Sequence, residues 1–211
     1  MNQQWTNKDL VDIVAQLQLN KEPYFMYKRV MFFRANFAEN DIVLSYIAQE
    51  VAKSGGAMST TMRRSVFEEC AKTDSSRVLQ WVLDNTDPGN EYFPVVSILT
   101  DILSQPDESI AQFGIAHELG HFVCGHHAAD LKIVTQGQQV NLSQYEYTER
   151  EFQADTYAIG LMGNSTGAIN AMTMLLDWIK RSDLPAQGIS PEVIQQSTDI
   201  VRLRINAAKQ T

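Results

Sequence analysis

The sequence of 211 residues is poor in cysteine, with only Cys70 and Cys124. Two cysteines form at most one bridge, so the chain lacks the disulfide framework of small secreted domains. It also lacks any apolar stretch close to the roughly 18 residues that a membrane-spanning helix requires. Its first residues, MNQQWTNKDL, have neither the basic nor the apolar part of a signal peptide. We therefore expect a cytoplasmic protein without a membrane span.

Glycine, proline and positive charge are also scarce. The 11 Gly and 6 Pro exclude collagen-like and low-complexity chains. The 17 Lys and Arg residues are outnumbered by 25 Asp and Glu residues, which gives a net charge of −8. Because nucleic-acid-binding proteins normally carry a basic surface, we expect no nucleic-acid partner. What is present is 44% hydrophobic residues, an ordinary globular composition for one compact domain with a real core.

Hydrophobic spacing predicts an α+β fold that is mostly helical. Residues 1–86 are expected to form a helical N-terminal region that packs on the rest of the chain. Within it the stretch 25–37 is either helix or extended. The helices predicted in this region cover 7–19, 39–54, 59–72 and 74–84.

Residues 87–211 are expected to form the second part of the chain, with a small sheet before a central helix. Residues 92–99 are aromatic and β-branched and predict a strand, in which Pro94 favours an edge position or the strand start. Residues 131–142 are either a weak hairpin or a loop. The helices predicted here cover 106–125, 148–162, 166–181 and 191–208.

The helix predicted over 106–125 contains the pattern HExxH at residues 117–121. Residues four apart share one face of a helix, so His117 and His121 can bind one metal ion from successive turns. Glu118 lies beside them, where it can act as a catalytic base on a water molecule. A catalytic zinc site has three protein ligands and an open position. The pattern therefore predicts one zinc ion per chain and a third ligand elsewhere, although Co²⁺ or Mn²⁺ would suit the same donors.

His127 is one candidate for the third ligand. It lies ten residues after His117, as in the metzincin pattern HExxHxxGxxH. Cys124, however, stands where that pattern has its glycine, and Gly125 comes one residue late.

Glu151 is the other candidate, and it lies on a predicted helix with Asp155 four residues further on. A glutamate can bind the metal from this helix while an aspartate one turn later accepts the remaining N–H of a ligating histidine. Glu149 is close in sequence but has no aspartate at that spacing. The paired carboxylates favour Glu151.

The HExxH at 117–121 followed by ExxxD at 151–155 resembles the gluzincin metallopeptidases. This combination is shared by the CaaX prenyl protease and HtpX group and by the ImmA/IrrE group. The resemblance covers about residues 104–165 and implies a zincin-like metallopeptidase core over 87–211. It also implies functional residues: His117, His121 and Glu151 as zinc ligands, Glu118 as catalytic base and Asp155 as support for a ligand. Residues 1–90 match neither group, so the subfamily and the substrate stay open.

A peptidase also needs a donor for the negative charge that develops on the carbonyl oxygen. Four side chains are near enough in sequence to supply it or to contact substrate: Tyr145, Tyr147, Tyr157 and His127.

The patterns together predict a soluble zinc-dependent endopeptidase that hydrolyses peptide bonds of a protein or peptide substrate. The strand at 92–99 is the candidate to pair with an extended substrate. Two other hypotheses are a regulatory or binding module that holds zinc without turnover, and an effector or toxin protease controlled by a partner. Glu118 favours catalysis, because a structural zinc site has no need of that carboxylate. The oligomeric state stays open.

Overall fold

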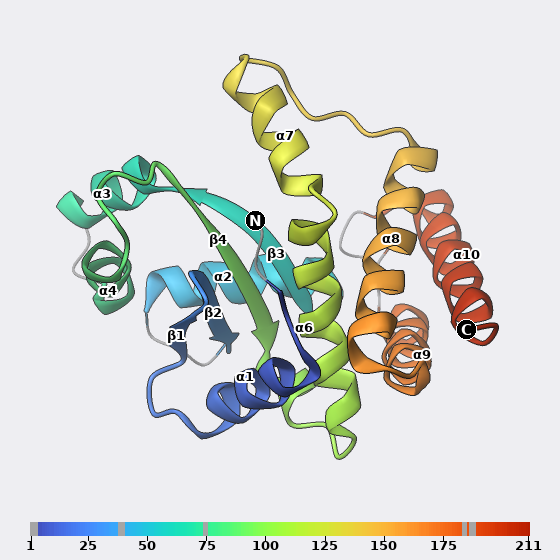
Figure 1. The fold of residues 1–211 in the computed structure, drawn as a ribbon. Coiled ribbons are helices and arrows are strands. Elements are labelled where there is room, and N and C mark those ends of the chain that lie inside the picture. Colours follow the sequence, from blue (N-terminus) through green and yellow to red (C-terminus); the bar gives the residue numbers. More distant parts are fainter. Residues whose placement is uncertain (1–3, 38–40, 74–75, 183–184, 186–188) are drawn as a thin grey trace.

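The computed structural model of the chain describes residues 4–37, 41–73, 76–182, 185 and 189–211. Helices in these ranges enclose one four-stranded sheet with the order β1-β2-β4-β3 (Figure 1). The expected α+β, mostly helical fold is therefore confirmed. The four strands are β1 (Tyr24–Tyr27), β2 (Val30–Ala35), β3 (Ala57–Arg63) and β4 (Tyr92–Leu99).

The sheet is mixed, and three of its four described strands come from the N-terminal region that was predicted to be helical. β1 and β2 form an antiparallel hairpin, which decides the stretch 25–37 in favour of extended structure. β2 pairs with β4 in parallel, and β3 pairs with β4 antiparallel. The prediction of a helix over 59–72 was wrong in its first part, because β3 occupies 57–63 and only then does α3 (Arg64–Thr73) begin. Pairing with β4, a distant segment, overrides the local pattern there.

The strand at 92–99 is predicted correctly, but it is an interior strand. Leu99 N donates to Gly56 O, so Gly56 and Leu99 form a hydrogen-bonded pair of the ladder between β3 and β4. Bonded and non-bonded pairs alternate along an antiparallel ladder. Thr61 and Pro94, five positions further along, are therefore a non-bonded pair. The nitrogen of Pro94 thus points away from β3. The parallel ladder with β2 begins only at Val95, so the missing N–H costs no ladder bond. Of the two positions predicted for Pro94, the structure excludes the sheet edge and agrees with a place near the strand start.

The helices agree with most of the predicted ranges. Residues 39–40 and 74–75 of the predicted helices lie outside the described residues. The segment 131–142 is not a hairpin: its first part belongs to a helix that starts at His126, and 138–143 is a loop. The remaining helices are α1 (Asn7–Leu19), α2 (Ile42–Lys53), α4 (Arg77–Asn85), α5 (Thr100–Leu103), α6 (Glu108–Val123), α7 (His126–Thr135), α8 (Gln144–Met162), α9 (Thr166–Arg181) and α10 (Pro191–Ala208).

The sheet is buried on both faces, and α6 lies along one of them. Alternate residues of β2 and β4 point to opposite sides, as strand geometry requires. Phe32 and Val96 pack with Ile115 and Leu119 of α6. On the other face, Phe33 and its neighbours pack against α2 and α4. Figure 1 shows that α8, α9 and α10 cover the side of α6 that faces away from the sheet.

Asp9 anchors the start of α1 to the β1–β2 turn. It forms a capping box with Thr6 and accepts hydrogen bonds of 2.8 Å from Lys28 Nζ and 2.8 Å from Tyr27 OH. Burial alone would raise the pKa of Asp9, but these hydrogen bonds outweigh it and lower the pKa to about 2.

The Asp9 carboxylate should stabilise the fold in a pH-dependent way. Because the pKa is lower in the folded chain than the ordinary 3.8, the stabilisation is complete above about pH 4 and is lost as the pH falls towards 2. A pKa shift of one unit corresponds to about 1.4 kcal/mol of stability. Asp9→Asn should therefore lower the free energy of unfolding by about 2 kcal/mol at pH 7 and by far less near pH 2. Urea denaturation at both pH values measures this, with Asp12→Asn as the control on the same helix. An equal loss at both pH values would contradict the assignment.

Candidate metal centre

A glycine lets α6 and α8 approach with their backbones in contact. A Cβ on Gly120 would lie 3.0 Å from both the Cα and the carbonyl oxygen of Ala154. Only glycine fits this crossing without a shift of one helix. Because Glu151 lies nearly one turn before Ala154, the close approach brings Glu151 to the face of α6 that carries His117 and His121.

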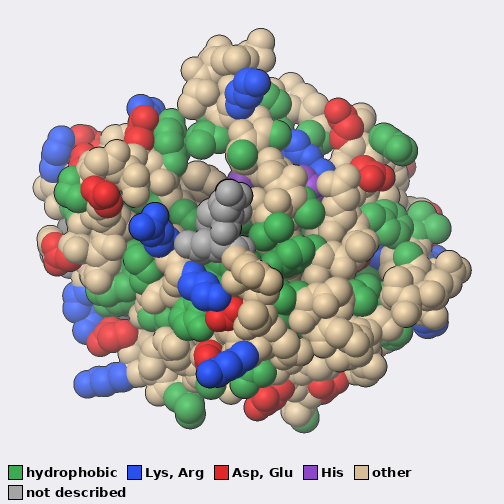
Figure 2. Space-filling view, viewed as in Figure 1, with side chains coloured by type: hydrophobic (Ala, Val, Ile, Leu, Met, Phe, Trp, Pro, Cys, Tyr) green, Lys and Arg blue, Asp and Glu red, His purple; other side chains and the backbone are tan. Residues whose placement is uncertain are grey.

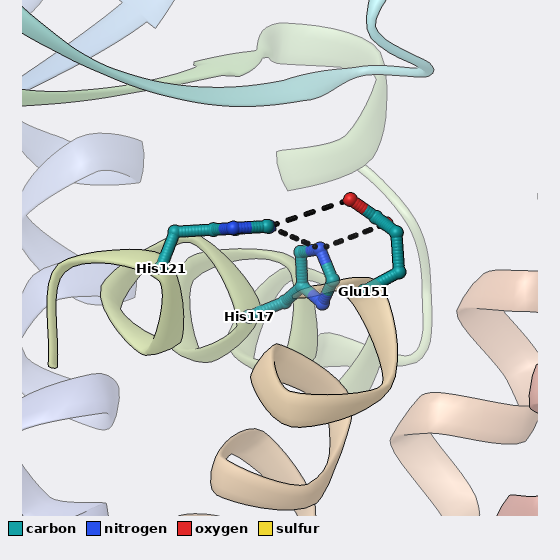
Figure 3. Close-up of side chains that lie close together, drawn as sticks. All are labelled: His117, His121 and Glu151. Atoms are coloured by element: carbon teal, nitrogen blue, oxygen red, sulfur yellow. Dashed lines mark hydrogen bonds and ion pairs between the residues drawn. The ribbon is translucent and has the colours of Figure 1, made fainter. Parts of the chain in front are cut away.

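Three side chains converge at this crossing, as Figure 3 shows. His117 Nε2 and His121 Nε2 are 3.1 Å apart. Glu151 places Oε2 3.4 Å from His117 Nε2 and Oε1 3.6 Å from His121 Nε2. Donor atoms about 2.1 Å from a tetrahedral ion lie roughly 3.4 Å from one another, so this arrangement fits a metal ion of zinc's size. Among the described residues, His117, His121 and Glu151 form the cluster that could hold one.

Asp155 lies behind His117. Its Oδ1 accepts a hydrogen bond of 2.9 Å from His117 Nδ1, so that Nε2 is the ring nitrogen that faces the cluster. Burial opposes the charged form of His117, but Asp155 and Glu151 outweigh it and raise the pKa of His117 to about 10. The surroundings of this imidazole therefore favour positive charge, which a bound cation would also supply.

Arg204 of α10 is a buried residue of the site that the sequence analysis missed. Its Nη1 donates to Glu151 Oε2 at 2.7 Å, and its Nε and Nη2 donate to the two oxygens of Asp155 at 2.7 and 2.8 Å. Although burial disfavours their charge, the guanidinium and His117 hold the pKa of both carboxyl groups below their usual range. The sequence does contain an indication of this role. Arg204 has the helical spacing that places it on the buried face of α10, together with Val201, Ile205 and Ala208.

Glu118 faces the edge strand β3. It is only 8% exposed, and burial raises the pKa of its carboxyl group. The charge of His117 and the nearby hydroxyl and backbone N–H of Ser59 oppose this rise in pKa. Ser59 is a second residue that the sequence analysis missed, because nothing in the local pattern of residues 57–63 relates it to the HExxH helix.

His127 lies beside β3 and outside the three-residue cluster. Gly125, with φ 80°, ends α6 and starts α7, so the chain turns one residue later than in the metzincin pattern. His127 Nε2 is then 2.9 Å from Ser59 Oγ. The described structure thus brings Glu151, and not His127, to the two HExxH histidines.

The sequence model of peptidase family M48 matches residues 57–210. The chain belongs to peptidase family M48. The expected zincin-like metallopeptidase is therefore confirmed, and M48 peptidases depend on a metal ion. Comparisons with curated proteins and with solved structures gave no match. No helix in the described part of this M48 peptidase is long and apolar enough to cross a membrane.

The remaining candidates lie at different distances from the centre of this M48 peptidase. Tyr147 is 48% exposed, but partial desolvation of its hydroxyl together with the charge of Glu151 raises the pKa of Tyr147 to about 12. Tyr145 is 76% exposed at the start of α8. Tyr157 instead lines an apolar pocket of about 410 Å³ together with Trp5. In Figure 2, histidine side chains are visible in the hollow below the projecting end of α7.

Metal content should distinguish the two candidate third ligands. Glu151→Ala removes one of three converging donors and should leave the purified chain without its metal ion. His127→Ala should keep about one ion per chain, because the His127 ring lies beside His121 but its Nε2 faces Ser59 and is not one of the converging donor atoms. Mass spectrometry of metals in the two variants and the wild type measures this. Loss of metal from His127→Ala alone would reverse the assignment.

The crossing at Gly120 should control metal affinity through backbone position. Gly120→Ala introduces a Cβ at 3.0 Å from backbone atoms of α8, so α8 and Glu151 must move away from α6. We expect a loss of about 1–3 kcal/mol of stability and metal binding at least tenfold weaker. Gly160→Ala is the matched control on α8, since its Cβ would meet nothing within 4 Å. Thermal denaturation and metal titration check both, and unchanged affinity in Gly120→Ala would contradict the role of the crossing.

Proposed function

We propose that this M48 metallopeptidase is a zinc-dependent endopeptidase of the gluzincin type that hydrolyses peptide bonds of a protein substrate. His117, His121 and Glu151 are the proposed zinc ligands, Glu118 the catalytic base and Asp155 the carboxylate that orients His117. The observation that carries the proposal is the convergence of three donor atoms within 4.8 Å of one another beside a buried glutamate that is not one of them. Two imidazoles and one carboxylate with an open position are typical of catalytic zinc.

Zinc bound at this site would lower the pKa of a water molecule to about 7 and polarise the scissile carbonyl. Glu118 removes a proton from the attacking water as its oxygen bonds to the carbonyl carbon. The same carboxyl group then delivers that proton to the leaving nitrogen as the C–N bond breaks. Burial raises the pKa of Glu118, which suits a group that must accept and release a proton in one cycle.

The edge of β3 is the proposed binding surface for an extended substrate. Because Gly56 and Leu99 are a bonded pair, Ala57, Ser59 and Thr61 are non-bonded towards β4 and direct their backbone groups to the open edge. The contact of the Ser59 N–H with Glu118 agrees with this orientation. A substrate strand paired here lies next to the catalytic base. The strand first considered for this role, β4, is interior and cannot serve.

Tyr147 and His127 are the proposed donors to the carbonyl oxygen or to the substrate. A tyrosine whose pKa is about 12 keeps its hydroxyl proton at neutral pH and can donate it in a hydrogen bond. His127, held by Ser59, lies at the β3 side of the site. His127 of α7 lies beside His121, and Tyr147 of α8 lies within the field of Glu151.

Replacing Glu118 separates metal binding from turnover. Glu118→Gln should retain about one zinc per chain but lose roughly 10²- to 10⁴-fold in turnover, because glutamine cannot accept the proton. Digestion of a denatured proteome, read by mass spectrometry of the new peptide ends, measures turnover without a known substrate. Glu108→Gln, at the exposed start of the same helix, is the matched control. Activity retained by Glu118→Gln would contradict the base, and a zinc-loaded wild type without cleavage would favour a zinc module that does not turn over.

A further inference from the structure

His126 is a buried histidine that the proposed mechanism does not use. It is the first residue of α7 and is 6% exposed. Its Nδ1 is 2.8 Å from His121 Nδ1, and its Nε2 is 2.9 Å from Gln153 Oε1. Each ring nitrogen of His126 therefore has one hydrogen-bond partner, and one of the two partners is a proposed zinc ligand.

Glu149 determines the direction of these hydrogen bonds. Gln153 Nε2 donates to Glu149 Oε1 at 3.0 Å, and an ionised carboxylate can only accept. The amide oxygen of Gln153 is therefore the atom that faces His126, and it requires a donor. His126 supplies that donor from Nε2–H.

A neutral imidazole with its proton on Nε2 has an acceptor at Nδ1. His126 Nδ1 thus accepts from His121 Nδ1–H, which leaves the lone pair of His121 on Nε2. Nε2 is the atom that lies 3.1 Å from His117 Nε2 and 3.6 Å from Glu151 Oε1. The chain of bonds from Glu149 through Gln153 and His126 therefore specifies which nitrogen of His121 faces the cluster.

We propose that His126 is a positioning residue that holds His121 in the tautomer and orientation required for zinc binding. This inference rests on the proposed function. Asp155 performs the corresponding task for His117 with a carboxylate, whereas His126 performs it with an imidazole. The turn at Gly125, with φ 80°, places His126 over His121 by starting α7 directly after α6.

The zinc affinity of the full chain tests the proposal. His126→Leu removes the acceptor and should weaken zinc binding about 10- to 100-fold, the usual effect of losing a partner of a metal ligand. His126→Asn keeps an acceptor oxygen near the Nδ1 position and should remain within about threefold of the wild type. His127→Leu, the neighbouring histidine, should leave zinc affinity unchanged. Competition with a chromophoric chelator measures all four proteins, with the melting temperatures of the metal-free forms recorded alongside.

The comparison of His126→Asn with His126→Leu distinguishes a positioning role of His126 from a purely structural one. If His126 only filled space, asparagine and leucine would weaken binding equally, and that outcome would overturn the proposal. Zinc binding by His126→Leu as tight as that of the wild type would overturn it as well. A wild type that binds no zinc would overturn the proposed function and this inference with it.

Proton positions give a second readout that needs no metal and no activity. Nitrogen-15 NMR of the histidine rings in the metal-free wild type should place the proton of His126 on Nε2 and that of His121 on Nδ1. Protons found on His126 Nδ1 or His121 Nε2 would overturn the proposal even if the chain binds zinc.

Discussion

The contact between α6 and α8 at Gly120 is the constraint on which the site depends. Two of the proposed ligands come from one helix and the third from another, so their spacing is set by how closely the helix axes approach. Gly120 allows Ala154 to touch the backbone of α6, and Glu151 then reaches both histidines. The buried core around Leu119 holds α6 against the sheet while α8 packs from the opposite side.

The buried carboxylates near the α6–α8 crossing are neutralised in part by a buried arginine. Glu151 and Asp155 are both buried, and Arg204 donates to each of them. Loss of one partner from such a buried network typically costs about 3–5 kcal/mol, because the remaining charge is left uncompensated. α10 is therefore part of the site, although it supplies no ligand. With neutral histidines, Glu151, Asp155 and Arg204 together carry one net negative charge, which favours a divalent cation.

The two histidines of the HExxH helix are supported in different ways. Behind His117 is a carboxylate that favours a positively charged ring, whereas behind His121 is a second imidazole, and burial there favours a neutral ring. The sheet contributes Ser59 of β3 to the site, and Ser59 contacts both Glu118 and His127. The two proposed histidine ligands and the proposed base thus come from α6, the third proposed ligand from α8 and the proposed substrate edge from β3.

The sequence by itself determined those features that depend on neighbours along one helix. His117, Glu118 and His121 were recognisable because residues four apart share a face, and the pairing of Glu151 with Asp155 follows from the same spacing. The strand at 92–99 and helices such as α9 and α10 were also predicted, since each carries its own hydrophobic pattern and start signal. Only the tertiary structure decided that residues 57–63 form a strand and that Arg204 and Ser59 belong to the site. β3 forms because β4 pairs with it, and the partners of Arg204 and Ser59 in the site lie at least 49 residues away from them along the chain. Such contacts depend on how whole elements pack, which no local spacing encodes.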